Sequence, residues 1–174
     1  GDVVSADDEG QVVMWGAPGL DAPVACPWTH EGGVQACIEI QDGRIVTAGS
    51  SGLLAVWDQR DRGPSLLRET GSGDAVLSLC ELRDERVVVG SSQACVELWD
   101  LRMPRQASLL VQGQSMVSRI GQQSGDVPLH LEPVRCLTEL RDGILAVGAG
   151  RFVWLYQCGA LECTDRLEGH TDEV

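Results

Sequence analysis

The sequence predicts an all-β protein built from four-stranded antiparallel sheets, and three observations carry that prediction. An aromatic residue recurs at a fixed interval, because Trp15, Trp57 and Trp99 are each 42 residues apart and Tyr156 takes the same place in a fourth copy. Each of these residues closes a pair of short apolar runs separated by a turn rich in Gly, Ser and Asp. Helical periodicity is nearly absent.

The remaining strands of each unit lie on either side of this pair. A further apolar run precedes the pair in three copies, which align without gaps from Val34, Val76 and Val134 and end in Asp-Gly or Asp-Glu, the chemistry of a hairpin turn. A fourth strand is expected after each aromatic residue, at 23–28, 64–69, 106–111 and 160–167.

Four antiparallel strands repeated at this interval predict the blades of a β-propeller. The count is three strands and then three complete blades, so we expect a slice of a larger ring, of seven blades. The expected divisions are an incomplete first blade at 1–29, complete blades at 34–70, 75–112 and 134–168, a loop insertion at 113–133, and the start of a further repeat at 169–174.

The pairs Trp57-Asp58, Trp99-Asp100 and Gly169-His170 make the chain resemble the WD-repeat family, similar in pattern to the G-protein β subunit. In that family the innermost strand begins four residues after the histidine, which implies that Val174 begins the next inner strand. The resemblance also implies a rigid platform that other proteins bind at one mouth of the ring.

Three histidines occupy one position of the repeat, since His30, His130 and His170 each precede a valine by four residues, with Ser72 in that position in the remaining copy. Their distribution over several blades argues against a metal cluster. The resemblance implies that each joins a hydrogen-bonded network with a turn aspartate, a hydroxyl and the aromatic residue of the repeat. The predicted network residues are therefore His30, His130, His170, Trp15, Trp57, Trp99 and Tyr156.

The sequence departs from the family at the turn aspartate, which is Glu9, Ser51 and Gln93 in the first three copies. We therefore expect an incomplete network, with Ser5 and Thr47 as the hydroxyl partners.

A glutamate recurs in the innermost strand of each blade, as Glu39, Glu81 and Glu139, and an arginine follows two residues later in two copies. Two interpretations stay open. The glutamates form ion pairs between blades, or they line the channel and hold a cation.

Composition limits the function classes. A net charge of −13 argues against nucleic-acid binding, and no apolar run is long enough to insert in a membrane. The seven cysteines show no metal-ligand spacing, which favours a reducing, cytoplasmic or nuclear compartment. Known catalytic motifs and lysine are both absent, so we expect no enzyme activity, no catalytic residues, no metal and no cofactor.

Two features are expected to bind partner proteins. The insertion carries a short apolar segment with one cation, Met116, Val117, Arg119 and Ile120, although a surface insertion without function is the plainer interpretation. The motif W-D-x-R occurs twice and places Arg60 and Arg102 just past two blades.

The expected function is that of a non-enzymatic scaffold for protein–protein interaction within a larger complex. The tandem W-D-x-R motifs resemble those of cullin-RING ubiquitin-ligase substrate receptors, which is one alternative. A structural subunit of a coat or ciliary assembly, or a regulatory domain of a larger enzyme, is another. We expect an open arc of blades to self-associate or to need further blades, because its end faces are uncovered.

Overall fold

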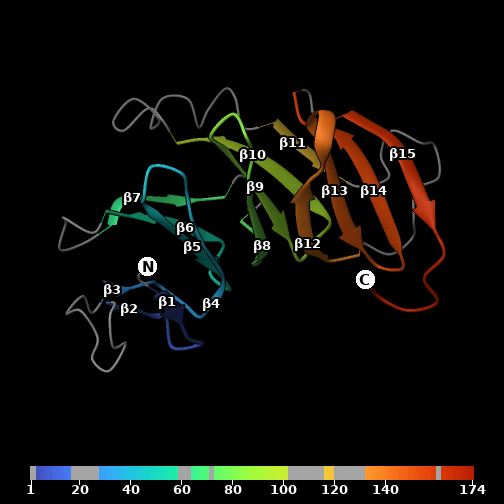
Figure 1. The fold of residues 1–174 in the computed structure, drawn as a ribbon. Coiled ribbons are helices and arrows are strands. Elements are labelled where there is room, and N and C mark those ends of the chain that lie inside the picture. Colours follow the sequence, from blue (N-terminus) through green and yellow to red (C-terminus); the bar gives the residue numbers. More distant parts are fainter. Residues whose placement is uncertain are drawn as a thin grey trace.

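The structure is a computed structural model that describes residues 3–16, 28–58, 64–70, 73–101, 116–119, 132–159 and 162–174. Within these ranges the protein is all-β, as predicted, with fifteen strands, one 3₁₀ turn and no α-helix (Figure 1). Among the described residues, no helix is long and apolar enough to span a membrane.

The strands form four antiparallel sheets, in each of which neighbouring strands follow one another along the chain. Sheet 1 has three strands and sheets 2 to 4 have four each. Sheet 1 contains β1 (Val3–Ala6), β2 (Gln11–Trp15) and β3 (Trp28–Thr29). Sheet 2 contains β4 (Val34–Glu39), β5 (Ile45–Gly49), β6 (Leu53–Trp57) and β7 (Pro64–Glu69). Sheet 3 contains β8 (Val76–Glu81), β9 (Arg86–Ser91), β10 (Cys95–Asp100) and β11 (Met116–Arg119). Sheet 4 contains β12 (Val134–Glu139), the 3₁₀ turn η1 (Arg141–Gly143), β13 (Ile144–Ala149), β14 (Phe152–Gln157) and β15 (Glu162–Glu168).

The outermost strand of sheet 3 differs from the sequence-based expectation. β11 pairs with β10 through Cys95 opposite Arg119 and Leu98 opposite Met116. This strand lies inside the segment 113–133 expected to be a loop, whereas the strand expected at 106–111 lies outside the described residues. The insertion therefore supplies an edge strand of the sheet.

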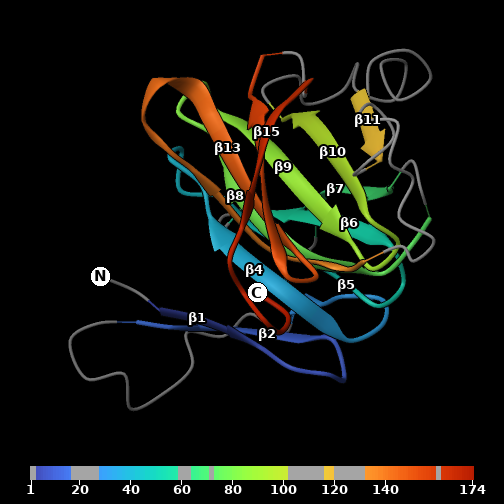
Figure 2. The same ribbon diagram turned by 90° about the vertical axis from the view of Figure 1, so that its right-hand side faces the viewer.

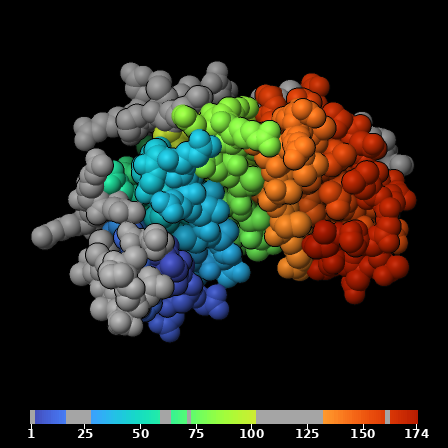
Figure 3. Space-filling model, in the orientation of Figure 1, coloured from blue at the N-terminus to red at the C-terminus, as the bar shows by residue number. Residues whose placement is uncertain are grey.

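The sheets pack face to face in chain order, as consecutive bands of colour in Figure 3 show. Seen from the sheet 4 end, β13 and β15 lie in front of β8, β9 and β10 of sheet 3 (Figure 2). One apolar core fills each of the three boundaries. We call the face of a sheet that points toward the lower-numbered sheet its leading face, and the opposite face its trailing face.

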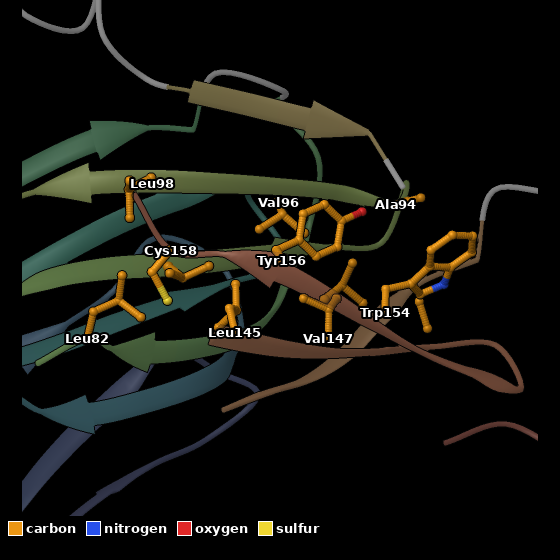
Figure 4. Close-up of a cluster of buried hydrophobic side chains, with 12 residues drawn as sticks. Leu82, Ala94, Val96, Leu98, Leu145, Val147, Trp154, Tyr156 and Cys158 are labelled. Carbon is orange, nitrogen blue, oxygen red and sulfur yellow. The ribbon is translucent and has the colours of Figure 1, made fainter. Parts of the chain in front are cut away.

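The repeated aromatic residue lies on the leading face. Trp57 packs in the core between sheets 1 and 2, where its ring stacks on Trp28 with centroids 5.3 Å apart. Trp99 lies in the core between sheets 2 and 3. Tyr156, with Trp154 beside it, lies in the core between sheets 3 and 4 (Figure 4). Sheets 2, 3 and 4 thus each cover the trailing face of the preceding sheet with an aromatic side chain.

The two end faces have no neighbouring sheet among the described residues, and they are uncovered. Trp15, on the leading face of sheet 1, is half-buried, whereas Trp57 is 1% exposed at the equivalent position. Leu155, on the trailing face of sheet 4, is half-buried, whereas Val56 is fully buried at the equivalent position of sheet 2.

Candidate functional site

The turns that join the first and second strands of sheets 2, 3 and 4 share one geometry and lie at the same end of the sheets. In each, the backbone N–H of the first residue donates to the carbonyl of the fifth, as from Ile40 to Arg44, from Leu82 to Arg86 and from Leu140 to Ile144. We call this end the turn side.

A glutamate bonds the turn of sheet 2 and the turn of sheet 3 to the following sheet. Glu81 of sheet 3 accepts the backbone N–H of Gln41 at 3.0 and 3.1 Å through its two carboxylate oxygens. Glu139 of sheet 4 accepts the backbone N–H of Arg83 at 2.7 Å. These glutamates therefore cross the boundary between sheets, as one interpretation of the sequence held, but they bond to main chain instead of to an arginine side chain.

An arginine makes a second bond across each of these boundaries. Arg44 donates to the carbonyl of Leu101 at 3.2 Å, and Arg86 donates to the carbonyl of Cys158 at 3.3 Å. Each arginine also pairs with the aspartate two residues before it, as Arg44 does with Asp42 at 2.7 Å. This hydrogen bond from Arg44 lowers the pKa of the Asp42 carboxyl, against a smaller opposing effect of burial. We call these contacts the arginine latches.

Sheet 4 breaks the latch pattern. Asp142 stands in the position of Asp42, but Ile144 stands in the position of Arg44 and Arg86. The trailing face of sheet 4 therefore has no guanidinium at the position from which Arg44 and Arg86 reach the following sheet.

A pocket of about 240 Å³ opens on the turn side between sheets 2 and 3. Its lining joins one apolar residue, one amide, three acids and one arginine: Ile40, Gln41, Asp42, Glu81, Glu85 and Arg44. The equivalent residues between sheets 3 and 4 carry a different balance of charge, because Arg83 replaces Gln41 and Gly143 replaces Glu85. The pocket between sheets 2 and 3 is therefore the more acidic of the two places.

Glu85 adopts an uncommon backbone conformation at the rim of this pocket. Its φ is 68°, in the left-handed region, where the equivalent residues Gly43 and Gly143 have φ of 84° and 70°. A side chain there costs roughly 1–2 kcal/mol relative to an ordinary conformation. At this position the other two turns have glycine, which adopts such a φ without that cost, although Asp142, one residue before Gly143, also has a positive φ of 65°. Glu85 therefore holds its carboxylate in a conformation that the equivalent glycines adopt freely.

The expected tryptophan–hydroxyl bonds are present in the first two sheets. Trp15 Nε1 donates to Ser5 Oγ at 2.9 Å, and Trp57 Nε1 donates to Thr47 Oγ1 at 2.8 Å in the core. In sheet 3 the hydroxyl position is Val89, and Trp99 Nε1 donates instead to Glu97 Oε2 at 3.3 Å. Sequence reasoning missed Glu97, whose only signal is an acid within the apolar strand β10, opposite the valine that stands at the hydroxyl position of β9.

Tyr156 lies in the core of sheet 4, and burial raises the pKa of its phenol. The residue at the hydroxyl position of this sheet is Val147, which lies opposite Trp154 as Thr47 lies opposite Ala55. Apolar packing, without a hydroxyl partner at that position, therefore holds Tyr156 in its place in the repeat.

The histidines differ from one another. His30 is buried, with Nδ1 3.4 Å from the carbonyl oxygen of Gly32 and no hydrogen-bond partner at Nε2. His170 is exposed, and His130 lies outside the described residues. The backbone N–H of His30 donates to the carbonyl of Gly10, and in the next sheet the backbone N–H of Thr70 donates to the carbonyl of Gly52. Ser72 lies outside the described residues.

The predicted partner-binding residues are only partly located. Arg60, Arg102 and Ile120 lie outside the described residues. The backbones of Met116, Val117 and Arg119 belong to β11. The structure therefore places three of the six residues on the outer strand of sheet 3.

Within the described part of the chain, no group of three or more His, Cys, Asp or Glu side chains is arranged to hold a metal ion, and the described cysteines form no disulfide with one another. No family model and no curated protein matches the sequence.

Proposed function

We propose that this chain is a non-enzymatic scaffold that binds other proteins, and that the pocket between sheets 2 and 3 receives a cationic side chain of a partner. The observation that carries the proposal is the acidic pocket with the strained Glu85 at its rim. A scaffold needs a rigid surface and a recognition site on it, and the turn side supplies both.

Rigidity comes from the bonds between sheets. The glutamate contacts and the arginine latches repeat across both boundaries between the four-stranded sheets, so the turns of sheets 2 and 3 are each bonded twice to the following sheet. A surface that is ordered before binding loses less conformational entropy when a partner docks.

Recognition comes from the lining of the pocket. Buried Ile40 offers an apolar surface to the methylene groups of a lysine or arginine, and Glu85 offers a carboxylate to its charged end, beside Asp42, which Arg44 already pairs. A net charge of −13 also favours approach of a basic segment.

The test uses phage-displayed ten-residue peptides selected on the wild-type chain. We expect the enriched peptides to share a lysine or arginine, and their binding to fall at least tenfold for Glu85→Arg. The matched control is Glu9→Arg, which reverses an exposed charge at the opposite end of the sheets and should leave binding unchanged. Enriched peptides without a cation, or equal binding to the wild type and Glu85→Arg, contradict the proposal.

A further inference from the structure

The trailing face of sheet 4 is an apolar sheet surface with no neighbouring sheet among the described residues. In sheet 2 the residues of the equivalent face are buried by sheet 3, with Val46, Leu54 and Val56 fully buried. Their counterparts in sheet 4 are partly exposed. The exposed or half-buried residues of this face include Cys136, Leu140 (41% exposed), Ala146, Val153, Leu155 and Leu167 (49% exposed).

The leading face of sheet 1 is the complementary surface. In sheets 2 and 3 this face carries the tryptophan that packs against the preceding sheet. Sheet 1 presents Trp15, hydrogen-bonded to Ser5, together with half-buried Val13 and exposed Val3. The bonded indole thus has the same arrangement as Trp57 with Thr47, without the sheet that buries Trp57.

The trailing face of sheet 4 already accepts the first contact of such a packing. In the core between sheets 3 and 4, the Val134 side chain packs directly over Gly90. Val174 takes the same place over Gly148, where a Cβ would lie 3.2 Å from its Cγ1, and its N–H donates to the carbonyl of Gly150 at 2.7 Å. Sheet 4 therefore receives a valine as sheet 3 does.

We propose that two copies of this chain associate head to tail, with the leading face of sheet 1 of each copy covering the trailing face of sheet 4 of the other. Every boundary inside the chain joins these same two kinds of face, so the association continues an interface that the fold already uses three times. Sheets 1 and 4 lie at opposite ends of the molecule, so one copy does not join its own ends (Figures 1 and 3). Two copies give eight sheets, which lies within the range in which propellers close.

Head-to-tail contacts have a property that separates them from a contact between two identical faces. Each contact uses two different faces, so a change on either face disrupts both contacts of the pair. Two chains changed on different faces still share one intact contact, because the unchanged trailing face of one meets the unchanged leading face of the other.

The experiment measures molar mass by light scattering after size-exclusion chromatography, for the 174-residue chain and two variants. Leu155→Arg changes the trailing face of sheet 4, and Val13→Arg changes the leading face of sheet 1. We expect twice the chain mass for the wild type, the single chain mass for each variant, and a return to twice the mass when the two variants are mixed. The matched control, Leu67→Arg, changes an exposed leucine on outer strand β7 and should retain the doubled mass.

Several results overturn the proposal. A monomeric wild type at about 100 μM does so, as does a mass that grows with concentration beyond two copies, which indicates an open filament. A dimer that Leu155→Arg disrupts but Val13→Arg does not is a contact between two sheet 4 faces. Far-UV circular dichroism shows whether each variant is folded, and recovery of the doubled mass in the mixture excludes misfolding as the cause of the lost association.

Discussion

Trp57 Nε1 donates a 2.8 Å hydrogen bond to Thr47 Oγ1 in the core between sheets 1 and 2, and Trp15 makes the same bond to Ser5 at the open end of the arc. The two bonds have nearly equal length and differ in burial. This difference decides how much each contributes to stability, because an unpaired polar group costs most where water cannot reach it.

Thr47→Val should therefore destabilise the protein by about 1–3 kcal/mol, since it leaves the Trp57 indole N–H without an acceptor in the core. In the monomeric Leu155→Arg variant, Ser5→Ala should cost less than about 0.5 kcal/mol, because water can replace the hydroxyl at an exposed site. Urea denaturation at one protein concentration measures both free energies of unfolding. Equal losses for the two variants would contradict the assignment.

Glu97 replaces the hydroxyl in sheet 3, and a double-mutant cycle tests that substitution. Glu97→Ala should cost about 1–3 kcal/mol, because Trp99 Nε1 loses its acceptor. Val89 on β9 lies directly opposite Glu97 on β10, as Thr47 on β5 lies opposite Ala55 on β6 in sheet 2.

The double variant Val89→Thr with Glu97→Ala copies that arrangement of sheet 2. We expect it to recover part of the stability lost by Glu97→Ala, with a coupling energy of about 0.5–3 kcal/mol. Simple addition of the two single effects would show that the tryptophan does not exchange one acceptor for the other.

The arginine latches should contribute independently. Arg44→Ala and Arg86→Ala each remove one bond to a carbonyl of the following sheet and one partly exposed ion pair, so each should cost about 1 kcal/mol. The two latches cross different boundaries and share no residue, so the double variant should lose the sum of the single effects in urea denaturation. A marked departure from additivity would show that sheets 2 to 4 respond as one coupled unit.

Glu85→Gly should stabilise the protein by up to about 1 kcal/mol, because glycine adopts a positive φ without the steric cost but orders more backbone on folding. The same change should weaken the binding of cationic peptides. Gly43→Ala in the neighbouring turn is the matched reverse change and should destabilise. A destabilised Glu85→Gly would mean that the carboxylate makes contacts that outweigh the strain.

Cys37 should resist alkylation in the native protein. Burial raises the pKa of its thiol from 9.0 to about 11, so at pH 8 its reactive thiolate is roughly a hundredfold scarcer than that of an ordinary thiol. Its labelling by iodoacetamide should keep rising about tenfold per pH unit up to pH 10. Exposed Cys136, assayed in the monomeric Val13→Arg variant, should label far faster at pH 8, as peptide mass spectrometry would show. Equal rates at the two cysteines would contradict the prediction.

The sequence was sufficient to predict the sheets because each sheet is a local unit. Trp57 and Thr47 are ten residues apart, and a tight turn between two short strands brings them together, so composition and spacing already specify the pair. Val34, Val76 and Val134 align without gaps for the same reason, and the structure places a register irregularity directly after each of them.

The outer strand of sheet 3 could not be predicted in the same way. The segment after Trp99 contains two apolar runs, at 106–111 and 116–119, and no turn residue distinguishes between them. Which of the two runs pairs with β10 depends on contacts with that strand, and the sequence of the segment alone does not specify those contacts.

The pocket was missed because it forms between sheets. Asp42 and Glu85 belong to successive repeats and meet only when the turns of two sheets pack side by side. One signal was present: an aspartate and an arginine two residues apart recur in the turns of sheets 2 and 3, as Asp42 with Arg44 and Asp84 with Arg86. This regularity marks the latches, although it does not show what they bind.

Ile144 makes the boundary that forms on the trailing face of sheet 4 weaker under load than the boundaries inside the chain. At the two boundaries with an arginine, a guanidinium on the turn side donates a hydrogen bond to a main-chain carbonyl. At a boundary formed on sheet 4, Ile144 can make only apolar contact at that position. Under pulling force or rising temperature, a ring assembled from two copies would open first between sheet 4 of one copy and sheet 1 of the other. The four sheets of each chain would then separate as one unit.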